Sequence, residues 1–303
     1  MNVGVIGAGN MGRNHIRVYS ELKGVEEIYI FDANLEQTKK MSKFGVNICS
    51  SLEELLDKVD CVSICAPTKY HFEIAKKCIE KNIPCLIEKP ITLNYEEGKK
   101  LLKLDKEKII KGVGHIERFN PVISEIAKII EKPLYIELKR RNPGSSRITD
   151  VSIIEDLMIH DIDIIFNKLF KNKPYKIEDV MGNSDLCNIS ISFGDCFVSL
   201  SGSRISNKKI RKIYIEEKDK TIEGDFMTQE IFIYKKPSKY LADNSSYKQE
   251  NIIEKVLTSK IEPLRVELKL FLDCIKKGEE FPISALEGVS NLKICERIRG
   301  LLK

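Results

Sequence analysis

The chain has no tryptophan, only four histidines, and no cysteine pair at Cys-x-x-Cys spacing. His15, His71, His115 and His160 are scattered and lack the ligand spacing with cysteines that zinc requires, so no metal site is expected. The nine cysteines are odd in number and belong to a chain of 303 residues. A small disulfide scaffold is therefore not indicated, and buried free thiols in a reducing compartment are expected.

Long hydrophobic runs are also missing. No apolar stretch approaches the roughly 18 residues of a membrane span, and Met1–Ile6 lacks the basic segment of a signal peptide. The 50 basic and 45 acidic residues are mixed along the chain, which gives a net charge of +5 without a clustered basic face for nucleic acid. A cytoplasmic globular protein without a nucleic-acid or membrane partner is expected, long enough for two domains.

The first third of the chain alternates short apolar runs with amphipathic stretches. This alternation is typical of a parallel sheet covered by helices, so residues 1–117 are predicted to form a Rossmann domain. Strands are expected at Asn2–Ile6, Glu27–Phe31, Val59–Cys65, Cys85–Ile87 and Ile109–Val113, with helices at Gly12–Ser20, Leu35–Lys43, Phe72–Lys81 and Tyr95–Lys106.

From about Glu117 the pattern changes to strands with one polar face. Residues 118–303 are predicted to form an α+β domain with a mostly antiparallel open sheet, which binds substrate and mediates oligomerisation. The helix at 285–302 is expected to pack back on the first domain, and Lys236–Asn251 to form a surface loop. Strands are expected at Tyr135–Lys139, Asn188–Phe193, Phe197–Ser201, Lys212–Glu216, Thr221–Asp225 and Gln229–Tyr234, and further helices at Ile153–Phe170 and Leu264–Lys277.

A glycine-rich turn joins the first strand to the first helix. The segment reads Gly7-Ala8-Gly9-Asn10-Met11-Gly12, the G-x-G-x-x-G pattern of dinucleotide-binding proteins. Gly7 permits the tight turn, Gly9 lets a pyrophosphate approach the backbone, and Gly12 lets helix and strand pack closely. Asn10 and Met11 open the helix, whose N–H groups and partial positive charge attract phosphate.

An acidic residue completes this pattern. Asp32 ends the second strand, 20 residues past Gly12 (32 − 12), where a carboxylate binds the adenosine ribose hydroxyls. That carboxylate would repel a 2′-phosphate, and Ala33 and Asn34 provide no arginine to hold one. NAD is therefore the expected cofactor rather than NADP.

Two strand-end segments and one helix carry further polar side chains. Ala66-Pro67-Thr68-Lys69-Tyr70-His71 and Glu88-Lys89-Pro90 fall beyond the carboxyl ends of strands, where ligands bind open parallel sheets. Asp156 and His160 are four residues apart and share one helix face. A carboxylate beside an imidazole suits a general base, but it equally suits a surface ion pair, and the residues alone leave both open. Taken alone, Lys89 would be a solvated loop lysine.

Together, the glycine turn, the strand-end Glu-Lys-Pro and the later Asp-x-x-x-His resemble the glucose–fructose oxidoreductase and inositol dehydrogenase family (Gfo/Idh/MocA). The resemblance implies that Lys89 contacts the reacting hydroxyl and the nicotinamide, next to a cis Lys89–Pro90 bond. It implies that His160 is the general base, assisted by Asp156, with both near the substrate, and that the protein is a homodimer or homotetramer. It also assigns Ala66, Pro67, Thr68, His71 and Glu88 to the cofactor. Met158 departs from the glycine common in the family and is expected to narrow the substrate pocket.

The segment Gly114-His115-Ile116-Glu117-Arg118-Phe119-Asn120-Pro121 resembles the family's hinge into the second domain. It is most similar to the hinge of members that oxidise C3 of UDP-N-acetylglucosamine, which implies substrate contacts for His115 and Arg118. Arg140, Arg141 and Arg147 flank the loop before the predicted catalytic helix, and guanidinium groups bind pyrophosphate oxygens well. A plain solvated surface is the competing interpretation.

Three hypotheses for function follow. The first is an NAD-dependent dehydrogenase of UDP-N-acetylglucosamine that yields the 3-keto sugar. The second is a dehydrogenase of a free polyol or sugar such as inositol, in which the arginines leave substrate binding unaffected. The third is a non-catalytic NAD-binding regulator, against which Lys89, Asp156 and His160 argue.

Overall fold

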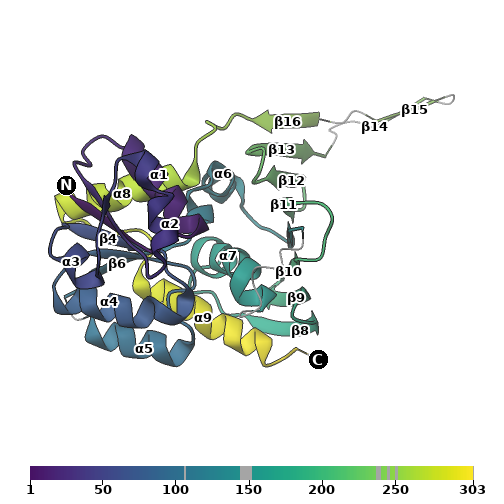
Figure 1. The fold of residues 1–303 in the computed structure, drawn as a ribbon. Helices are drawn as coiled ribbons and strands as arrows, with labels where there is room; N and C mark the ends of the chain where they lie inside the picture. Colours follow the sequence, from purple (N-terminus) through teal and green to yellow (C-terminus); the bar gives the residue numbers. More distant parts are fainter. Residues whose placement is uncertain (106, 144–151, 237–239, 244–245, 250–251, 303) are drawn as a thin grey trace. The chain divides into compact units, whose positions relative to one another are not determined.

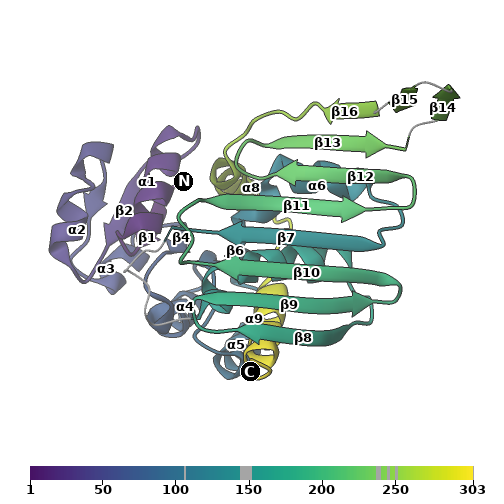
Figure 2. The ribbon, with the colours of Figure 1, turned by 90° about the vertical axis from the view of Figure 1, so that its right-hand side faces the viewer.

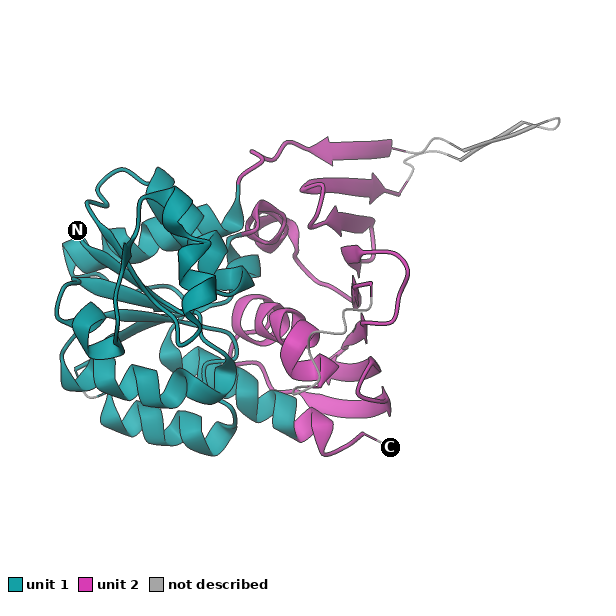
Figure 3. Ribbon diagram, viewed as in Figure 1, with its two compact units in different colours: residues 1–119, 262–296 teal, residues 120–261, 297–303 magenta. Residues whose placement is uncertain are grey.

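The computed structural model describes residues 1–105, 107–143, 152–236, 240–243, 246–249 and 252–302. The chain divides into two compact units, drawn in different colours in Figure 3. Unit 1 comprises residues 1–119 and 262–296, and unit 2 comprises residues 120–261 and 297–303. The boundary between Phe119 and Asn120 lies close to the predicted boundary at residue 117, but residues 262–296 fall in unit 1 rather than in the second domain.

Unit 1 is built on a six-stranded parallel sheet in the order β3-β2-β1-β4-β5-β6. This is the predicted Rossmann arrangement, with α1 and α8 on one face and α4 and α5 on the other (Figure 1). Its elements are β1 Val3–Ile6, α1 Asn10–Glu21, β2 Ile28–Phe31, α2 Leu35–Lys39, η1 Ser42–Phe44, β3 Asn47–Ile48, α3 Leu52–Leu56, β4 Cys61–Ile64, η2 Thr68–Tyr70, α4 His71–Glu80, β5 Cys85–Glu88, α5 Tyr95–Leu104, β6 Ile110–Gly114, η3 Ile116–Phe119, α8 Pro263–Lys277 and most of α9 Ala285–Arg299, whose last three residues are assigned to unit 2.

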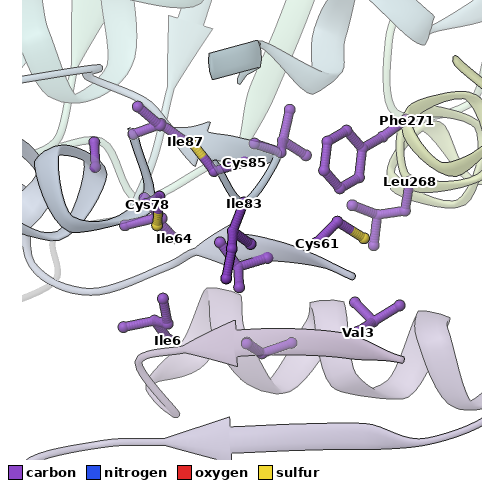
Figure 4. Packing of buried hydrophobic residues seen from close by; sticks show 14 of the residues in the cluster. Val3, Ile6, Cys61, Ile64, Cys78, Ile83, Cys85, Ile87, Leu268 and Phe271 are labelled. Atoms are coloured by element: carbon purple, nitrogen blue, oxygen red, sulfur yellow. The ribbon is translucent and has the colours of Figure 1, made fainter. Parts of the chain in front are cut away.

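The core of unit 1 explains why residues 262–296 join it. Every residue of β1, β4 and β5 is buried, as continuous apolar runs in a doubly covered sheet require. Helix α8 adds an apolar stripe to this core, and Figure 4 shows its Leu268 and Phe271 beside Cys61 of the sheet. Without α8, that face of the sheet would lie open to water.

Unit 2 contains an eight-stranded sheet in the order β16-β13-β12-β11-β7-β10-β9-β8 (Figure 2). All neighbouring strands run antiparallel except β7 and β10, so the predicted mostly antiparallel sheet is confirmed. Its elements are α6 Pro121–Ile129, β7 Tyr135–Arg141, η4 Ile154–Met158, α7 Ile159–Asp163, η5 Ile164–Leu169, β8 Lys176–Gly182, β9 Leu186–Phe193, β10 Cys196–Ser203, β11 Ile210–Glu216, β12 Lys220–Asp225, β13 Glu230–Lys235, β14 Tyr240–Asp243, β15 Ser246–Gln249 and β16 Ile252–Val256.

Three features of the second half differ from expectation. The predicted loop at Lys236–Asn251 contains the paired strands β14 and β15, and β8 and β16 extend the large sheet at its two edges. The predicted helix at Ile153–Phe170 is present, but only α7 has ordinary α-helical turns, and η4 and η5 have wider π-type turns.

No helix within the described ranges is long and apolar enough to cross a membrane.

Candidate cofactor and catalytic sites

The glycine turn after β1 adopts the geometry that its sequence predicts. Gly7 has a φ of +97°, and a Cβ there would lie 2.6 Å from the backbone nitrogen of Ala66. A Cβ on Gly12 would lie 1.8 Å from the carbonyl oxygen of Gly7, so helix and strand pack too closely for any side chain. A Cβ on Gly9 would meet nothing within 4 Å among the described residues, so the turn is open on that side.

Helix α1 begins at this open side with its donors unused. Its first turn contains no acidic residue, and the N-cap Gly9 provides no side-chain hydrogen bond. The N–H groups of Asn10, Met11 and Gly12 have no acceptor within the helix, because a helix leaves its first N–H groups unsatisfied. These donors and the helix dipole fit a pyrophosphate approaching over Gly9.

Replacing Gly9 and Gly12 by alanine, one at a time, should distinguish an effect on NADH binding from an effect on folding stability. We expect Gly12→Ala to destabilise unit 1 by about 1–3 kcal/mol, because its Cβ meets backbone that cannot move aside. Gly9→Ala should unfold within about 0.5 kcal/mol of wild type and yet bind NADH about tenfold or more weakly, since its methyl group occupies the phosphate approach. Thermal unfolding and NADH fluorescence titration measure the two effects. Wild-type NADH affinity in Gly9→Ala would place the pyrophosphate elsewhere.

Asp32 follows β2 and faces the glycine turn. Its Oδ2 accepts a hydrogen bond from the backbone N–H of Ala8 at 2.7 Å, and its Oδ1 accepts one from Asn34 at 2.8 Å. A carboxylate oxygen accepts more than one hydrogen bond, so Asp32 braces the turn and can still receive ribose hydroxyls. The adjoining cavity has a volume of about 570 Å³ and is lined by Ile6, Gly7, Phe31, Asp32, Ala33, Asn34, Leu52, Ala66, Pro67, Tyr70, Glu73, Ile74 and Lys77.

Several residues that line this cavity were not identified from sequence. Leu52 belongs to α3, a five-residue helix too short to give a periodic signal, although Ser51 caps it by accepting a hydrogen bond from Glu54. Tyr70 lies within the segment 66–71 and is half exposed, at 50%. Ile74 lies one helical turn further on, in α4. Such apolar positions near an adenosine site look like ordinary core residues until the fold places them at a cavity.

The loops after β4 and β5 are joined by His71. Its Nδ1 lies 2.8 Å from the carbonyl oxygen of Pro90, and its Nε2 lies 2.8 Å from that of Ala66. The ring is 1% exposed, and burial lowers the pKa of His71. His71 therefore holds both loops in place through contacts in the interior. The Lys89–Pro90 peptide bond is cis, as predicted.

Glu88 ends β5 in a buried ion pair with His15 of α1. His15 Nε2 lies 3.0 Å from Glu88 Oε1, and Oε2 accepts the backbone N–H of Lys89 at 3.2 Å. Burial acts to raise the pKa of Glu88, but the hydrogen bond and charge of His15 outweigh it, so the pKa lies below its ordinary value. Glu88 thus fixes the backbone at Lys89, whose own side chain is half-buried. Sequence analysis gave His15 no such role, although it lies only three residues past Gly12.

Asp156 and His160 stand out on the helical segment of unit 2. Every other side chain from residue 153 to residue 166 is buried, whereas these two are partly exposed. Met158 is 0% exposed and packs against Gly202 of β10. A Cβ built on Gly202 would lie only 2.6 Å from Cγ of Met158. The expectation that Met158 narrows a substrate pocket is therefore wrong, since its side chain fills the space between helix and sheet.

Arg140 anchors this helical segment to β7. Its Nη2 donates to Asp161 Oδ1 at 2.6 Å, its Nε lies 3.1 Å from both carboxylate oxygens, and both side chains are nearly inaccessible, at 1% and 2%. Alternation along the strand turns Arg141 to the opposite face, where it donates to Ser201 Oγ at 2.6 Å. Arg140 is thus buried in an ion pair with Asp161 and cannot reach a pyrophosphate, whereas Arg141 stays partly exposed.

The remaining predicted substrate contacts are distributed as follows. Arg147 lies outside the described residues. In unit 1, His115 Nε2 lies 3.1 Å from the side-chain nitrogen of Asn291, and Arg118 forms a 3.0 Å ion pair with Glu287. Among the described residues, no group of three His, Cys, Asp or Glu side chains could hold a metal ion.

Comparison with known proteins supports the cofactor assignment. The sequence model of the Gfo/Idh/MocA oxidoreductase family, described as having an NAD-binding Rossmann fold, matches residues 1–114. A UDP-N-acetylglucosamine 3-dehydrogenase of Acidithiobacillus ferrooxidans is 32% identical over 246 residues, which are 77% of each chain. An inositol 2-dehydrogenase of Corynebacterium glutamicum is 29% identical over 180 residues, about half the length of that enzyme.

Solved structures agree with this relationship. The structure of UDP-N-acetylglucosamine 3-dehydrogenase from Acidithiobacillus ferrooxidans superposes with a TM-score of 0.87, at 26% identity, over 100% of this chain and 97% of that one. Levoglucosan dehydrogenase in complex with NADH shares the fold, with a TM-score of 0.83 at 18% identity over 99% of this chain and 96% of that one. Identity above 30% across most of both chains, together with the Rossmann match, makes this chain a dehydrogenase of the Gfo/Idh/MocA oxidoreductase family.

Proposed function

We propose that this protein oxidises a hydroxyl-bearing carbon of a nucleotide sugar, C3 of UDP-N-acetylglucosamine, to a ketone. The proposal rests above all on the 32% identity to a UDP-N-acetylglucosamine 3-dehydrogenase over 77% of both chains. The hinge segment His115-Ile116-Glu117-Arg118-Phe119-Asn120-Pro121 adds to it, since its sequence is most similar to the hinge of that group.

The chain's own residues have three tasks in this reaction. Lys89, at the end of β5, is proposed to hold the reacting hydroxyl, with its backbone fixed by Glu88. His160 is proposed to remove the proton from that hydroxyl, and Asp156 to orient the imidazole. Both lie on a helix that is otherwise buried between residues 153 and 166, so they are the side chains it presents outward. NAD, when bound, supplies the acceptor for the hydride that leaves the same carbon.

NAD is proposed over NADP because of Asp32. Its carboxylate is held by the N–H groups of Ala8 and Asn34 beside the cavity, so it cannot swing away from a ribose. A 2′-phosphate at that position would place two negative groups together, which costs free energy. Lys77 lines the same cavity, but it is already paired with Glu53. Asn10 and Met11 at the start of α1, with Gly9, are proposed to hold the pyrophosphate, and Ala66, Pro67 and Thr68 to line the path toward Lys89.

The substrate diphosphate is proposed to be bound by Arg118 and Arg147, with His115 placing the hinge. Arg140 is not included, because its guanidinium group is buried against Asp161. Arg141 is partly exposed and stays a candidate beside Arg118. A free polyol is the second candidate, since inositol 2-dehydrogenases match 54% of the chain. Such a substrate would need no diphosphate contact.

The decisive experiment measures NADH absorbance with a panel of substrates. We expect reduction of NAD with UDP-N-acetylglucosamine and little or none with UDP-glucose or myo-inositol. Replacing NAD by NADP should lower kcat/KM about 100-fold, the effect of roughly 3 kcal/mol of repulsion at Asp32. Faster reduction with myo-inositol would contradict the nucleotide-sugar proposal, and equal rates with NADP would contradict the role of Asp32.

A further inference from the structure

Helix α8 carries a carboxyl group in the core of unit 1 that the proposed reaction does not use. Glu267 is 0% exposed and lies between Leu264, Leu268 and Phe271 on the buried side of the helix. Within the part of the chain that the structure describes, neither of its carboxyl oxygens has a hydrogen-bond partner. A buried carboxyl in this position costs several kcal/mol unless a partner satisfies it, so its presence requires an explanation.

The groups that act electrostatically with Glu267 come from the three elements around it. Tyr19 lies on α1, Cys65 follows β4, and Glu88 ends β5. The Tyr19 hydroxyl is 2.7 Å from Ser63 Oγ, so Tyr19 already has a partner. Burial and the negative charge of Glu88 raise the pKa of Glu267 well above its ordinary value, which favours the neutral acid with an O–H donor.

A second buried polar atom belongs to the same cluster. His15 Nε2 contacts Glu88, but His15 Nδ1 is also buried and has no hydrogen-bond partner among the described residues. The pair of His15 and Glu88 therefore includes one unsatisfied nitrogen, and the charge of Glu88 also acts on the unsatisfied carboxyl of Glu267. Internal water that makes about three hydrogen bonds is the usual partner of such groups in a polar interior.

We propose that Glu267 is a positioning residue, bound through an internal water molecule to the His15–Glu88 pair that holds the backbone of Lys89. The O–H of Glu267 donates to the water, and the water in turn reaches Glu88 or His15 Nδ1. Because Glu88 accepts the N–H of Lys89 at 3.2 Å, any shift of Glu88 is passed to Lys89. The inference about Glu267 deepens the proposed function, since it rests on the role given there to Lys89.

Two substitutions at Glu267 test the proposal. Glu267→Gln keeps a neutral donor and acceptor of the same shape, so it should keep the water and near wild-type kcat. Glu267→Leu removes both groups, and we expect it to fold with a melting temperature no lower than that of wild type, because it also removes a buried carboxyl. Its kcat should nevertheless fall about 10- to 100-fold with little change in substrate KM, as expected for a misplaced Lys89. Asp273→Asn, on the same helix, is the control.

A crystal structure of the wild-type protein and of Glu267→Leu completes the test. We expect a water within hydrogen-bond distance of Glu267 and of Glu88 or His15 in wild type, and none in Glu267→Leu. A dry cluster in wild type, or wild-type kcat in Glu267→Leu, would overturn the proposal. If no sugar is oxidised even by wild type, the proposed function fails, and the crystallographic water still decides the link from Glu267 to His15 and Glu88.

Stability against pH gives a third readout that needs no substrate. A carboxyl whose pKa is raised by folding adds stability below its unfolded pKa, near 4.5, and this stability is lost as pH rises toward the folded value. The melting temperature of wild type should therefore fall relative to that of Glu267→Gln as pH rises above about 4.5. The groups facing Glu267, namely Tyr19, Cys65, Glu88 and His15, are the same in both proteins. Parallel curves would show that Glu267 is not held neutral and would overturn the proposed donor.

Discussion

Replacing His160 by asparagine is expected to lower kcat/KM by about 10²–10⁴, the usual contribution of a general base. Asparagine keeps a polar side chain of similar size but cannot take a proton from the substrate hydroxyl. The rate that remains should lose its rise with pH on the acid side, because no group then has to be deprotonated before reaction. Steady-state kinetics from pH 5 to pH 9 measure both effects.

The surrounding helix provides the controls for this experiment. Lys168→Ala changes an exposed residue on the same helical segment and should leave kcat/KM unchanged. NADH affinity should also be unchanged in His160→Asn, because the residues proposed to bind the cofactor all belong to unit 1. Asp156→Asn should fall between wild type and His160→Asn, since it disturbs only the orientation of the ring. Full turnover in His160→Asn would assign the base to another residue.

Removing Arg140 is expected to destabilise unit 2 by about 3–5 kcal/mol, because Arg140→Ala takes away the guanidinium group that faces the buried Asp161 carboxylate. Asp161→Asn should act in the same direction. The double variant Arg140→Met with Asp161→Leu should recover most of the loss, since apolar side chains of similar size need no partner there. Hydrogen exchange of the amides of residues 153–169 measures the effect locally, which suits a chain of two units because multi-domain proteins commonly do not unfold in one transition.

A second arginine–aspartate pair in unit 2 serves as the comparison. Arg204 and Asp185 are 2.6 Å apart, but their side chains are 13% and 46% exposed. Arg204→Ala should therefore cost no more than about 1 kcal/mol. Equal protection losses in Arg140→Ala and Arg204→Ala would contradict the anchoring role of Arg140. A raised KM for a nucleotide sugar without any loss of stability would restore Arg140 as a substrate contact.

The sequence predicted the cofactor-binding fold of unit 1 better than it predicted the charged residues of unit 2. The Rossmann strands were predictable because continuous apolar runs such as Val3–Ile6 occur only where both faces of a strand are covered. The short elements β3 and α3, with two and five residues, escaped because they are shorter than the periodicity that reveals an element. Leu52 was therefore missed as a lining residue of the cavity beside Asp32.

Charge was the weaker guide. Arg140 and Arg141 look alike in sequence, next to each other before a polar loop. Strand alternation sends them to opposite faces, and only the packed helix shows that Arg140 meets Asp161, 21 residues further along the chain. Glu267 and His15 gave no signal at all, because a buried carboxyl and a surface carboxyl have the same local sequence.

The glycine turn and Asp32 were determined by the sequence itself. A tight turn, a close helix–strand contact and an open phosphate approach each constrain the backbone of a few consecutive residues. The glycines at positions 7, 9 and 12 therefore predict them directly. Tertiary structure alone decided the rest: that α8 completes the core of unit 1, that Arg140 is an anchor, and that His15 pairs with Glu88, which holds the backbone of Lys89. Burial and pairing depend on residues that are distant in sequence, and those distances close only when the chain folds.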